Sequence, residues 1–397
     1  MYPEMIAEKE GNNHKKHRKI CFVAAIELSL CVFMVEHIRK LSNENTVTVV
    51  VNTKNKEFLK PYGLDVKVVP VNIKRKPSPF SDIWAMFILF KLFRGKSFDI
   101  VHSITPKAGF VSMLAAYLAG VPIRIHTFTG QVWVNGKGIR RLILKNTDKL
   151  IALCATHILT DSKSQQDFII KENIVLPGKS FVIGNGSICG VDGMRFKHDL
   201  KARAELRRQF NISEDNVLFL FLGRLNADKG LLDLALAFSK LSESAKNAYL
   251  LIVGPDEEGI KNRMLTICSN CIDKIFFYDF TDKPERFMAA ADVLCLPSYR
   301  EGFGLVVIEA GSVGIPSIAT SIYGITDAIE DGSTGFLFKP GDIDSLTQKM
   351  SKMIEDPALR ESMGINARQR TSDNFSKELV TSAFIDYYTA LPHIKSN

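Results

Sequence analysis

The chain lacks a long hydrophobic run. Its longest uncharged apolar stretch, Ile83–Phe90, is far shorter than the roughly 20 residues that a membrane-spanning helix needs. Residues 1–18 have no apolar centre, so they do not match the pattern of a secretory signal. We interpret them as a basic, disordered tail. We therefore expect a cytoplasmic protein without a spanning helix.

Patterns typical of metal sites are also lacking. Cys268 and Cys271 form a CxxC pair, but no second pair or histidine cluster accompanies them, as a zinc site would require. Asp342 and Asp344 form a DxD pair of the kind that can hold a divalent cation. This pair follows Pro-Gly and precedes a helical pattern, so we expect Asp344 to cap a helix. We expect no metal and no cofactor.

Positive charge is unevenly distributed along the chain. Residues 1–190 hold 27 Lys and Arg against 14 Asp and Glu, and residues 51–150 alone hold 17 against 5. The remaining residues carry a net charge of −5. This asymmetry suggests that the first half meets an anionic partner, although a solubilising surface is the alternative interpretation. No nucleic-acid-binding motif is present, so nucleic acid is not the expected partner.

Short β-rich runs alternate with helical patterns throughout the chain, which predicts an α/β fold with parallel sheets. In the first half the expected strands are residues 19–26, 46–51, 66–71, 98–104, 123–128 and 157–162. In the second half they are residues 216–223, 248–254, 274–280, 292–298 and 315–320. The stretch 184–199, rich in Gly and polar residues, is the expected linker. We predict two Rossmann-like domains, 19–190 and 191–375, with a ligand cleft between them.

A first candidate site follows the strand that begins the second domain. Gly223 ends this strand, Arg224 and Lys229 lie in the turn, and a helix is expected to begin near Gly230. The junction of a strand, a loop and a helix presents backbone N–H groups and is a natural anion site. Two cations there can bind two phosphates, although a solvated surface pair is the alternative. The Walker A pattern GxxxxGK[ST] is absent.

A second candidate site is the run "EGFGLVVIE", which places Glu301 eight residues before Glu309. In one helix this spacing corresponds to about 12 Å along the axis, which is too far apart for a glycosidase carboxylate pair. It suits a longer ligand held at both ends, with sugar hydroxyls on Glu301 and a ribose diol on Glu309. Between them the helix amino terminus offers N–H groups to a diphosphate. The residues that line this part are Gly302, Phe303, Gly304 and Leu305.

The order of these motifs resembles glycosyltransferase family 4, whose members have the GT-B fold. The resemblance covers essentially residues 19–390. Besides the two candidate sites, it rests on the runs "NGSICGVDGMRF" (185–196), "DGSTGFLF" (331–338), "TPKAG" (105–109) and "HTFTGQVW" (126–133). The last two runs resemble the bacterial branch that builds O-antigen and capsule on lipid carriers.

The resemblance implies retaining sugar transfer without a metal ion. It implies that Arg224 and Lys229 bind the donor diphosphate, that Glu301 faces the donor sugar and that Glu309 holds the ribose. His126, at the end of its strand, would then lie beside the anomeric centre as a second catalytic residue. The expected partners are a nucleotide-sugar donor, with UDP favoured by the branch, and a saccharide on a polyprenyl diphosphate. The last helix, 376–397, is expected to return to the first domain.

The stretch 74–96 has a basic cluster at each end and an aromatic-rich centre. A helix packed against the core is the simplest interpretation of residues 81–94. A second interpretation, compatible with the first, is that one face of this helix touches an anionic membrane surface. We therefore expect a protein bound peripherally to the inner face of the bacterial cytoplasmic membrane. The residues expected on the acceptor or membrane side are Lys107, Lys74, Arg75, Lys76 and Trp84.

Two other classes of function remain open at this point. A sugar-nucleotide epimerase or hydrolase can share the fold, and a non-catalytic subunit can bind a nucleotide sugar for a partner enzyme. The chain also departs from the family pattern. The loop 23–31 lacks the common Gly-Gly pair, and Asp327 stands where relatives often have Glu.

Overall fold

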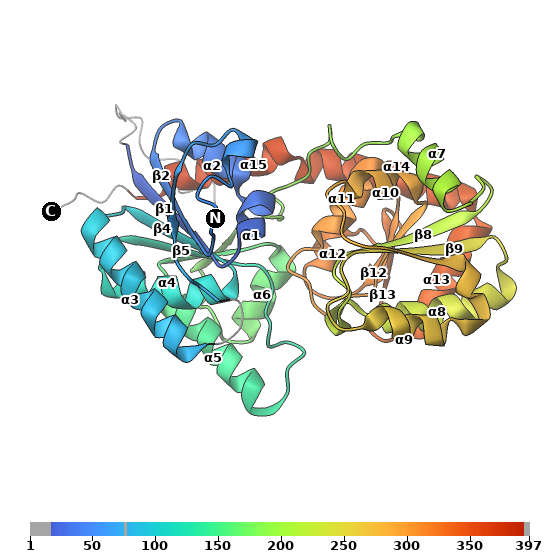
Figure 1. Cartoon of the computed structure of the whole chain (residues 1–397), viewed down its shortest axis with the longest axis horizontal. Helices are drawn as coiled ribbons and strands as arrows, with labels where there is room; N and C mark the ends of the chain where they lie inside the picture. Colours follow the sequence, from blue (N-terminus) through green and yellow to red (C-terminus); the bar gives the residue numbers. More distant parts are fainter. Residues whose placement is uncertain (1–16, 75–77, 393–397) are drawn as a thin grey trace. The chain divides into compact units, whose positions relative to one another are not determined.

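The computed structural model describes residues 17–74 and 78–392. The described residues divide into two compact units (Figure 1). The N-terminal unit contains the residues up to Cys189 and those from Glu378 onward, and the C-terminal unit contains Gly190–Lys377. Within the described residues, no helix combines the length and the apolarity needed to span a bilayer.

The N-terminal unit is built on a parallel sheet of seven strands in the order β3-β2-β1-β4-β5-β6-β7. The order reverses between β1 and β4, which is the arrangement of a doubly wound sheet. The strands are β1 Lys19–Ala24, β2 Thr46–Val51, β3 Lys67–Pro70, β4 Ile100–Ile104, β5 Ile123–Phe128, β6 His157–Thr160 and β7 Ser180–Val182.

Two apolar clusters cover the two faces of this sheet. The helices α3, α4, α5 and α6 pack on one face, and α1, α2 and α15 pack on the other (Figure 1). The central strands are therefore buried on both sides and are mostly apolar, with buried polar residues such as His102 and His126 among them. The helices are α1 Glu27–Phe33, α2 Val35–Ser42, α3 Pro79–Lys96, α4 Pro106–Leu118, α5 Gly138–Cys154, α6 Lys163–Lys171 and α15 Lys377–Ala390.

The last helix, α15, is held to the N-terminal unit by buried aromatic and histidine side chains. The Phe384 ring stacks on His37 at 4.0 Å between ring centroids. The Tyr388 hydroxyl is hydrogen-bonded to Nδ1 of His102 at 2.6 Å, and Nε2 of His102 is 2.7 Å from the hydroxyl oxygen of Thr127. Burial lowers the pKa of His102 well below its usual value, so the ring is neutral. The chain end is thereby fixed to β4 and β5.

The C-terminal unit is a parallel sheet of six strands in the order β10-β9-β8-β11-β12-β13. The order reverses between β8 and β11. The strands are β8 Val217–Leu222, β9 Ala248–Val253, β10 Ile275–Tyr278, β11 Val293–Leu296, β12 Ser317–Thr320 and β13 Gly335–Phe338.

The helices of the C-terminal unit lie on both faces of its sheet (Figure 1). The helices α7, α10, α11 and α14 lie on one face, and α8, α9 and α13 lie on the other. Their bounds are α7 Leu200–Gln209, α8 Leu231–Ser244, α9 Ile260–Ile267, α10 Pro284–Ala290, α11 Leu305–Val313, α12 Ile325–Ala328, α13 Ile343–Glu355 and α14 Pro357–Phe375.

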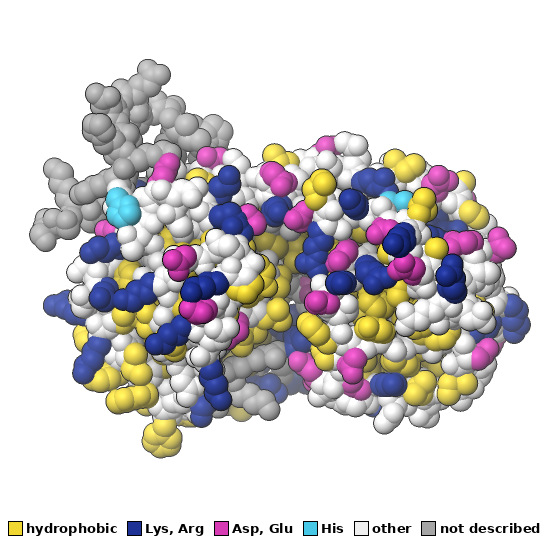
Figure 2. Space-filling view, turned by 45° about the horizontal axis from the view of Figure 1, so that its top comes forward, with side chains coloured by type: hydrophobic (Ala, Val, Ile, Leu, Met, Phe, Trp, Pro, Cys, Tyr) yellow, Lys and Arg dark blue, Asp and Glu magenta, His cyan; other side chains and the backbone are white. Residues whose placement is uncertain are grey.

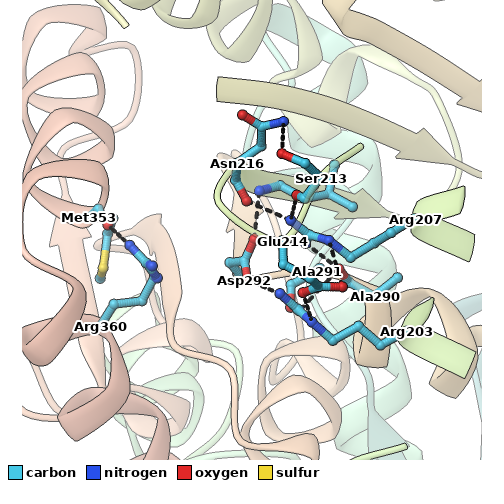
Figure 3. Close-up of polar contacts among 11 residues, drawn as sticks. Arg203, Arg207, Ser213, Glu214, Asn216, Ala290, Ala291, Asp292, Met353 and Arg360 are labelled. Carbon is cyan, nitrogen blue, oxygen red and sulfur yellow. Dashed lines mark hydrogen bonds and ion pairs between the residues drawn. The ribbon is translucent and has the colours of Figure 1, made fainter. Parts of the chain in front are cut away.

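A buried ionic cluster fixes the amino ends of β8 and β11 (Figure 3). Asp292 accepts hydrogen bonds from Arg203 at 2.9 Å, from Arg207 at 3.1 Å and from the backbone N–H of Leu218 at 2.7 Å. The Arg207 side chain is only 1% exposed and also donates to the carbonyl oxygens of Ser213 and Asn216. The cluster thus fastens α7 to the sheet at the edge opposite the carboxyl ends of the strands.

The expected α/β class and the two Rossmann-like sheets are confirmed. Two strands were not expected, β7 and β13, which are three and four residues long. The helices α1 and α2 meet at Met34.

The expectation for Asp344 was wrong. Asp342 caps α13 by accepting from the N–H of Ser345, and Asp344 pairs with Lys240 on the surface.

We predict that Asp292→Ala lowers the free energy of unfolding of the C-terminal unit by about 3–5 kcal/mol, because it removes the closest carboxylate partner of the buried Arg207. Chemical denaturation monitored by circular dichroism measures this. The matched control is Asp344→Ala, which removes an exposed ion pair worth about 0–1 kcal/mol. Equal effects of the two substitutions would contradict a structural role for the buried cluster.

Candidate functional site

The site in the C-terminal unit lies where the strand order of its sheet reverses. The loop 223–230 follows β8 and the loop 297–304 follows β11, and these two strands are neighbours. Ligands of doubly wound sheets bind outside the carboxyl ends of the strands at this point. Arg224, Lys229 and Glu301 all lie on these two loops, so the topology brings three of the expected residues to one edge of the sheet.

The two loops are in direct contact because Gly230 has no side chain. Its φ is +66°, and a Cβ there would lie 2.0 Å from the carbonyl oxygen of Pro297. Arg300 donates twice to Asp228, at 2.7 and 3.2 Å, and the N–H of Tyr299 donates to the Asp228 carbonyl at 2.8 Å. One ion pair, in which both Arg300 nitrogens donate to Oδ2 of Asp228, and one backbone hydrogen bond therefore join the loops.

Lys229 and Glu301 lie side by side, a contact that the sequence did not predict. The Lys229 ammonium group is 2.5 Å from the Glu301 carboxylate, which also accepts from the hydroxyl of Ser298 at 2.8 Å. Both side chains of the ion pair are more than four-fifths buried. The pair presents a cation and a carboxylate at neighbouring positions, which is the arrangement needed to bind a phosphate beside a hydroxylated ring.

Arg224 is the more open of the two expected phosphate-binding cations. Its side chain is 41% exposed, and one guanidinium nitrogen donates to both oxygens of Glu257, at 2.8 and 3.1 Å. Glu257 follows β9, the other neighbour of β8. The charge of the partly exposed Arg224 is thus already balanced by the carboxylate of Glu257.

Glu309 lies within α11, and Glu301 precedes that helix, as expected from the sequence. The Glu309 side chain forms no hydrogen bond or ion pair with another described residue. Burial raises the pKa of its carboxyl group to about 8, against the opposing effect of Arg195. A carboxyl group with this pKa is mostly protonated at neutral pH, so it can donate one hydrogen bond to a ligand hydroxyl and accept others.

The residues between the two glutamates form the start of α11. Gly304 has a φ of +77° and caps the helix, and Leu305 is its first residue. The Phe303 side chain is buried against Phe375, at 5.2 Å between ring centroids. Among these residues, Phe303 therefore has only its backbone available to a ligand.

In the N-terminal unit, His126 lies inside the sheet. It is the fourth residue of β5, two residues before the strand ends, and its ring has no exposed surface. Nδ1 shares a 2.8 Å hydrogen bond with the hydroxyl of Ser103, and Nε2 has no partner among the described residues. Burial lowers the pKa of the ring to about 3, so it is neutral. The expectation that His126 ends its strand was wrong by two residues.

Helix α4 packs directly against the His126 ring. A Cβ at Gly109 would lie 2.3 Å from Cε1 of His126, so this glycine permits the approach. The helix is capped by Thr105, which has a φ of +76° although it is not glycine. Such strain clusters at functional sites. The "TPKAG" run therefore shapes the environment of His126.

Of the residues expected on the acceptor or membrane side, Lys74, Trp84 and Lys107 are among the described residues. Lys107 forms an ion pair with Asp82 of α3. Trp84 is 63% exposed, and Lys74 is exposed. Arg75 and Lys76 lie outside the described residues. Ala85, Leu89 and Phe93 of α3 face the core, so this helix has one buried face and one apolar exposed face.

Sequence reasoning missed the partners of the expected residues. These partners are Glu257, which pairs with Arg224, and the ion pair between Arg300 and Asp228, which joins the loop of Lys229 to the loop of Glu301. A dipeptide Glu-Glu after β9 was the available signal for Glu257, because carboxyl ends of neighbouring parallel strands meet at one edge. In the described part of the chain, no group of three or more His, Cys, Asp and Glu side chains is placed to hold a metal ion.

Two family models match the chain. Residues 34–186 match the glycosyl transferase 4-like domain, and residues 202–370 match the glycosyl transferases group 1. The two matches fall in the N-terminal and the C-terminal unit, respectively.

Curated relatives cover most of the chain. The capsular polysaccharide biosynthesis glycosyltransferase CapM of Staphylococcus aureus is 30% identical over 378 residues, which are 92% of this chain and 95% of CapM. A UDP-Gal:alpha-D-GlcNAc-diphosphoundecaprenol alpha-1,3-galactosyltransferase of Escherichia coli is 29% identical over 312 residues, 76% of this chain and 78% of that one.

Solved structures of the same architecture also match. Alr3699/HepE of Anabaena, crystallised in complex with UDP, has a TM-score of 0.76 at 20% identity and covers 94% of this chain and 100% of its own. WaaG, a glycosyltransferase involved in lipopolysaccharide biosynthesis, has a TM-score of 0.71 at 17% identity, covering 92% and 99%. The fold of the two units, the order of the motifs and the nearly full-length similarity to CapM lead to one conclusion: the chain belongs to glycosyltransferase family 4 and has the GT-B fold.

Proposed function

We propose that this protein is a retaining glycosyltransferase that moves a hexosyl or N-acetylhexosaminyl group from a UDP-sugar to a lipid-linked saccharide. The acceptor is a saccharide on a polyprenyl diphosphate, and the product is a precursor of a bacterial surface polysaccharide. The observation that supports this most is the contact between Lys229 and Glu301 at the sheet edge that also carries Arg224. The name of the S. aureus relative supports a role in polysaccharide biosynthesis, and the name of the E. coli relative supports an acceptor linked to a polyprenyl diphosphate.

The cations have a clear task in such a reaction. When the bond between sugar and diphosphate breaks, negative charge grows on the departing phosphate oxygen. Arg224 and Lys229 carry the positive charge that stabilises it, and Lys229 is fixed in place by Glu301. Arginine binds phosphate in a planar fork, whereas lysine acts as a point charge. In this account both residues act on the leaving group and Glu301 orients the donor sugar.

Glu309 and His126 are assigned supporting contacts. Glu309, whose side chain is half-buried, forms hydrogen bonds with the ribose diol, which can both donate to and accept from a carboxyl group. His126 contacts the donor sugar through Nε2, the nitrogen without a partner among the described residues. Because that nitrogen is fully covered, we propose that α4 shifts near Gly109 when the donor binds. No metal ion or cofactor is assigned a role.

We propose further that the enzyme works at the inner face of the cytoplasmic membrane. Figure 2 shows Lys and Arg side chains next to hydrophobic side chains over the N-terminal unit. On α3 the exposed apolar residues Phe80, Ile83, Trp84 and Phe87 adjoin the exposed cations Lys91 and Arg94. Helix α5, which like α3 packs on α4, exposes Ile139, Leu142, Ile143 and Arg140. Apolar side chains edged by cations are the pattern of an interfacial surface.

Donor turnover distinguishes this function from the two alternatives. The wild-type protein is incubated with UDP-sugars, with and without a polyprenyl-diphosphate-linked saccharide. Transfer that requires the acceptor supports the proposal. Epimerised donor or free sugar would instead support an epimerase or hydrolase, and binding without turnover would support a non-catalytic subunit.

We predict that Arg224→Ala and Lys229→Ala each lower kcat by roughly 10²–10³, by analogy with the loss of one donor to a developing oxyanion. Glu309→Ala is expected mainly to raise KM, because a ribose contact is similar in the ground state and the transition state. Steady-state kinetics with saturating acceptor separates the two effects. A wild-type kcat in the Arg224→Ala enzyme would show that Arg224 does not stabilise the departing diphosphate.

We predict that Gly109→Ala lowers kcat strongly, because the added methyl group would overlap the His126 ring. Affinity for UDP should stay unchanged, since the residues assigned to the diphosphate lie in the other unit. His126→Ala should lower kcat by about 10²–10⁴, the usual range for a positioned acid or base. The control is Gly95→Ala in α3, where a Cβ meets no atom within 4 Å. A fully active Gly109→Ala enzyme would show that the position of His126 is not critical.

We predict binding to anionic vesicles that weakens with salt, since the Debye length falls to about 3 Å at 1 M. Charge reversal of Lys74, Arg75 and Lys76 to Glu should reduce co-sedimentation, because each cation near an anionic surface contributes about 1 kcal/mol. Reversal of the exposed Lys197, Lys201 and Lys339 of the C-terminal unit serves as control. Equal pelleting with neutral and anionic lipid would refute electrostatic docking.

A further inference from the structure

Two carboxylates already occupy the anion-binding groups of the loop 223–230. Glu257 contacts the Arg224 guanidinium with both of its oxygens. Its neighbour Glu258 accepts a hydrogen bond from the backbone N–H of Ala227 at 3.0 Å. A side-chain cation and a backbone N–H at a turn are the two kinds of donor that bind phosphate oxygens. In this state both donors are satisfied by groups of the protein itself.

The position of the two carboxylates is built into the fold. After the neighbouring strands β8 and β9 end, their chains continue side by side. The N–H of Leu225 donates to the carbonyl of Pro255 at 2.9 Å, and the N–H of Glu257 donates to the carbonyl of Leu225 at 3.1 Å. At Gly254 a Cβ would lie 1.9 Å from the Gly223 carbonyl oxygen, so no other residue permits this approach. The loop that follows β9 therefore carries Glu257 to Arg224 by backbone pairing.

A cap fixes the following turn in the same way. The Asp256 carboxylate accepts hydrogen bonds from the N–H groups of Ile260 at 2.9 Å and Lys261 at 3.1 Å, at the start of α9. Glu257 and Glu258 lie between this cap and the paired backbone. Only their side chains can then leave the loop 223–230 without unfolding the turn, and both are accessible, with Glu257 34% exposed.

We propose that Glu257 and Glu258 act as an internal counter-anion that a nucleoside diphosphate displaces when it binds. This inference rests on the proposed function, because it assumes that Arg224 binds the donor diphosphate. A diphosphate that approaches Arg224 meets Glu257 first, and like charges a few ångström apart repel each other. The side chain of Glu257 therefore exchanges its contact with Arg224 for water, and the phosphate takes its place.

This exchange has a consequence for the catalytic cycle. The two carboxylates lower the affinity of the site for every ligand that carries a diphosphate, including the nucleoside diphosphate left after sugar transfer. When the product leaves, Glu257 pairs with Arg224 again, so the charge of Arg224 is not left uncompensated. Glu257 and Glu258 are thus affinity-setting residues that favour product release, and they act on the anionic part of the ligand only.

Isothermal titration calorimetry with three probes tests the proposal on the full-length protein. The probes are UDP, inorganic diphosphate and uridine, which lacks phosphate. In Glu257→Gln, the Kd of UDP and of inorganic diphosphate should fall about 5-fold, the upper range for an exposed ion pair. The Kd of uridine should not change. UDP as product inhibitor should show a matching decrease in its inhibition constant.

Two further variants make the test specific. In an Arg224→Ala background, Glu257→Gln should change the Kd of UDP less than in the wild-type protein, because the contact with Arg224 is already lost and only the repulsion between Glu257 and the diphosphate remains. The control variant Glu205→Gln removes an exposed ion pair with Arg286 in the same unit, and it should leave all three Kd values unchanged. Added salt should reduce the difference between wild type and Glu257→Gln.

The outcomes that overturn the proposal differ from those that overturn the function. An unchanged or weaker affinity of Glu257→Gln for UDP would show that Glu257 orients Arg224 or has no part in binding, although transfer activity would still stand. An equal gain for uridine would assign the effect to the base or ribose. A wild-type protein that binds neither UDP nor diphosphate would overturn both the proposed function and this inference.

Discussion

The candidate site depends on the fastening of the loop after β8 to the loop after β11. Gly230 lets the two backbones touch at Pro297, and the ion pair between Arg300 and Asp228 holds them there. Only then does Lys229 reach Glu301. The amino ends of the same two strands are held by the buried Asp292 cluster. The site is therefore carried by two central strands that are fixed at both ends.

Much of the fold could be predicted because its strands are buried on both faces. Runs such as residues 46–51 and 123–128 are rich in β-branched and apolar residues, and the structure has strands at these bounds. The turn glycines and the motif "EGFG" placed Glu301 before a helix, as observed. The short β7 and β13 escaped prediction because three or four residues carry too little periodicity. In the DxD pair, the cap is Asp342, two residues before the predicted Asp344, because aspartate is a favoured cap residue at either position.

The partners of the site residues were not predicted, because they depend on contacts between loops that are far apart in the sequence. The sequence near Arg224 does not indicate its contact with Glu257, which is 33 residues away. The pairing of β8 with β9 brings the two residues together. The burial of His126 depends likewise on Gly109 of α4. The sequence motifs thus identified the residues and the family, whereas their charge balance required the structure. The cleft between the domains and the roles of individual residues remain predictions.

The central claim is that a sugar leaves a nucleotide diphosphate held by Arg224 and Lys229 and reaches its acceptor with its anomeric configuration retained. The most direct measurement is proton NMR of the disaccharide formed from an α-linked UDP-sugar and a polyprenyl-diphosphate-linked acceptor. The account predicts an α-linked product, seen in the coupling between H1 and H2 of the transferred sugar. A β-linked product would contradict it.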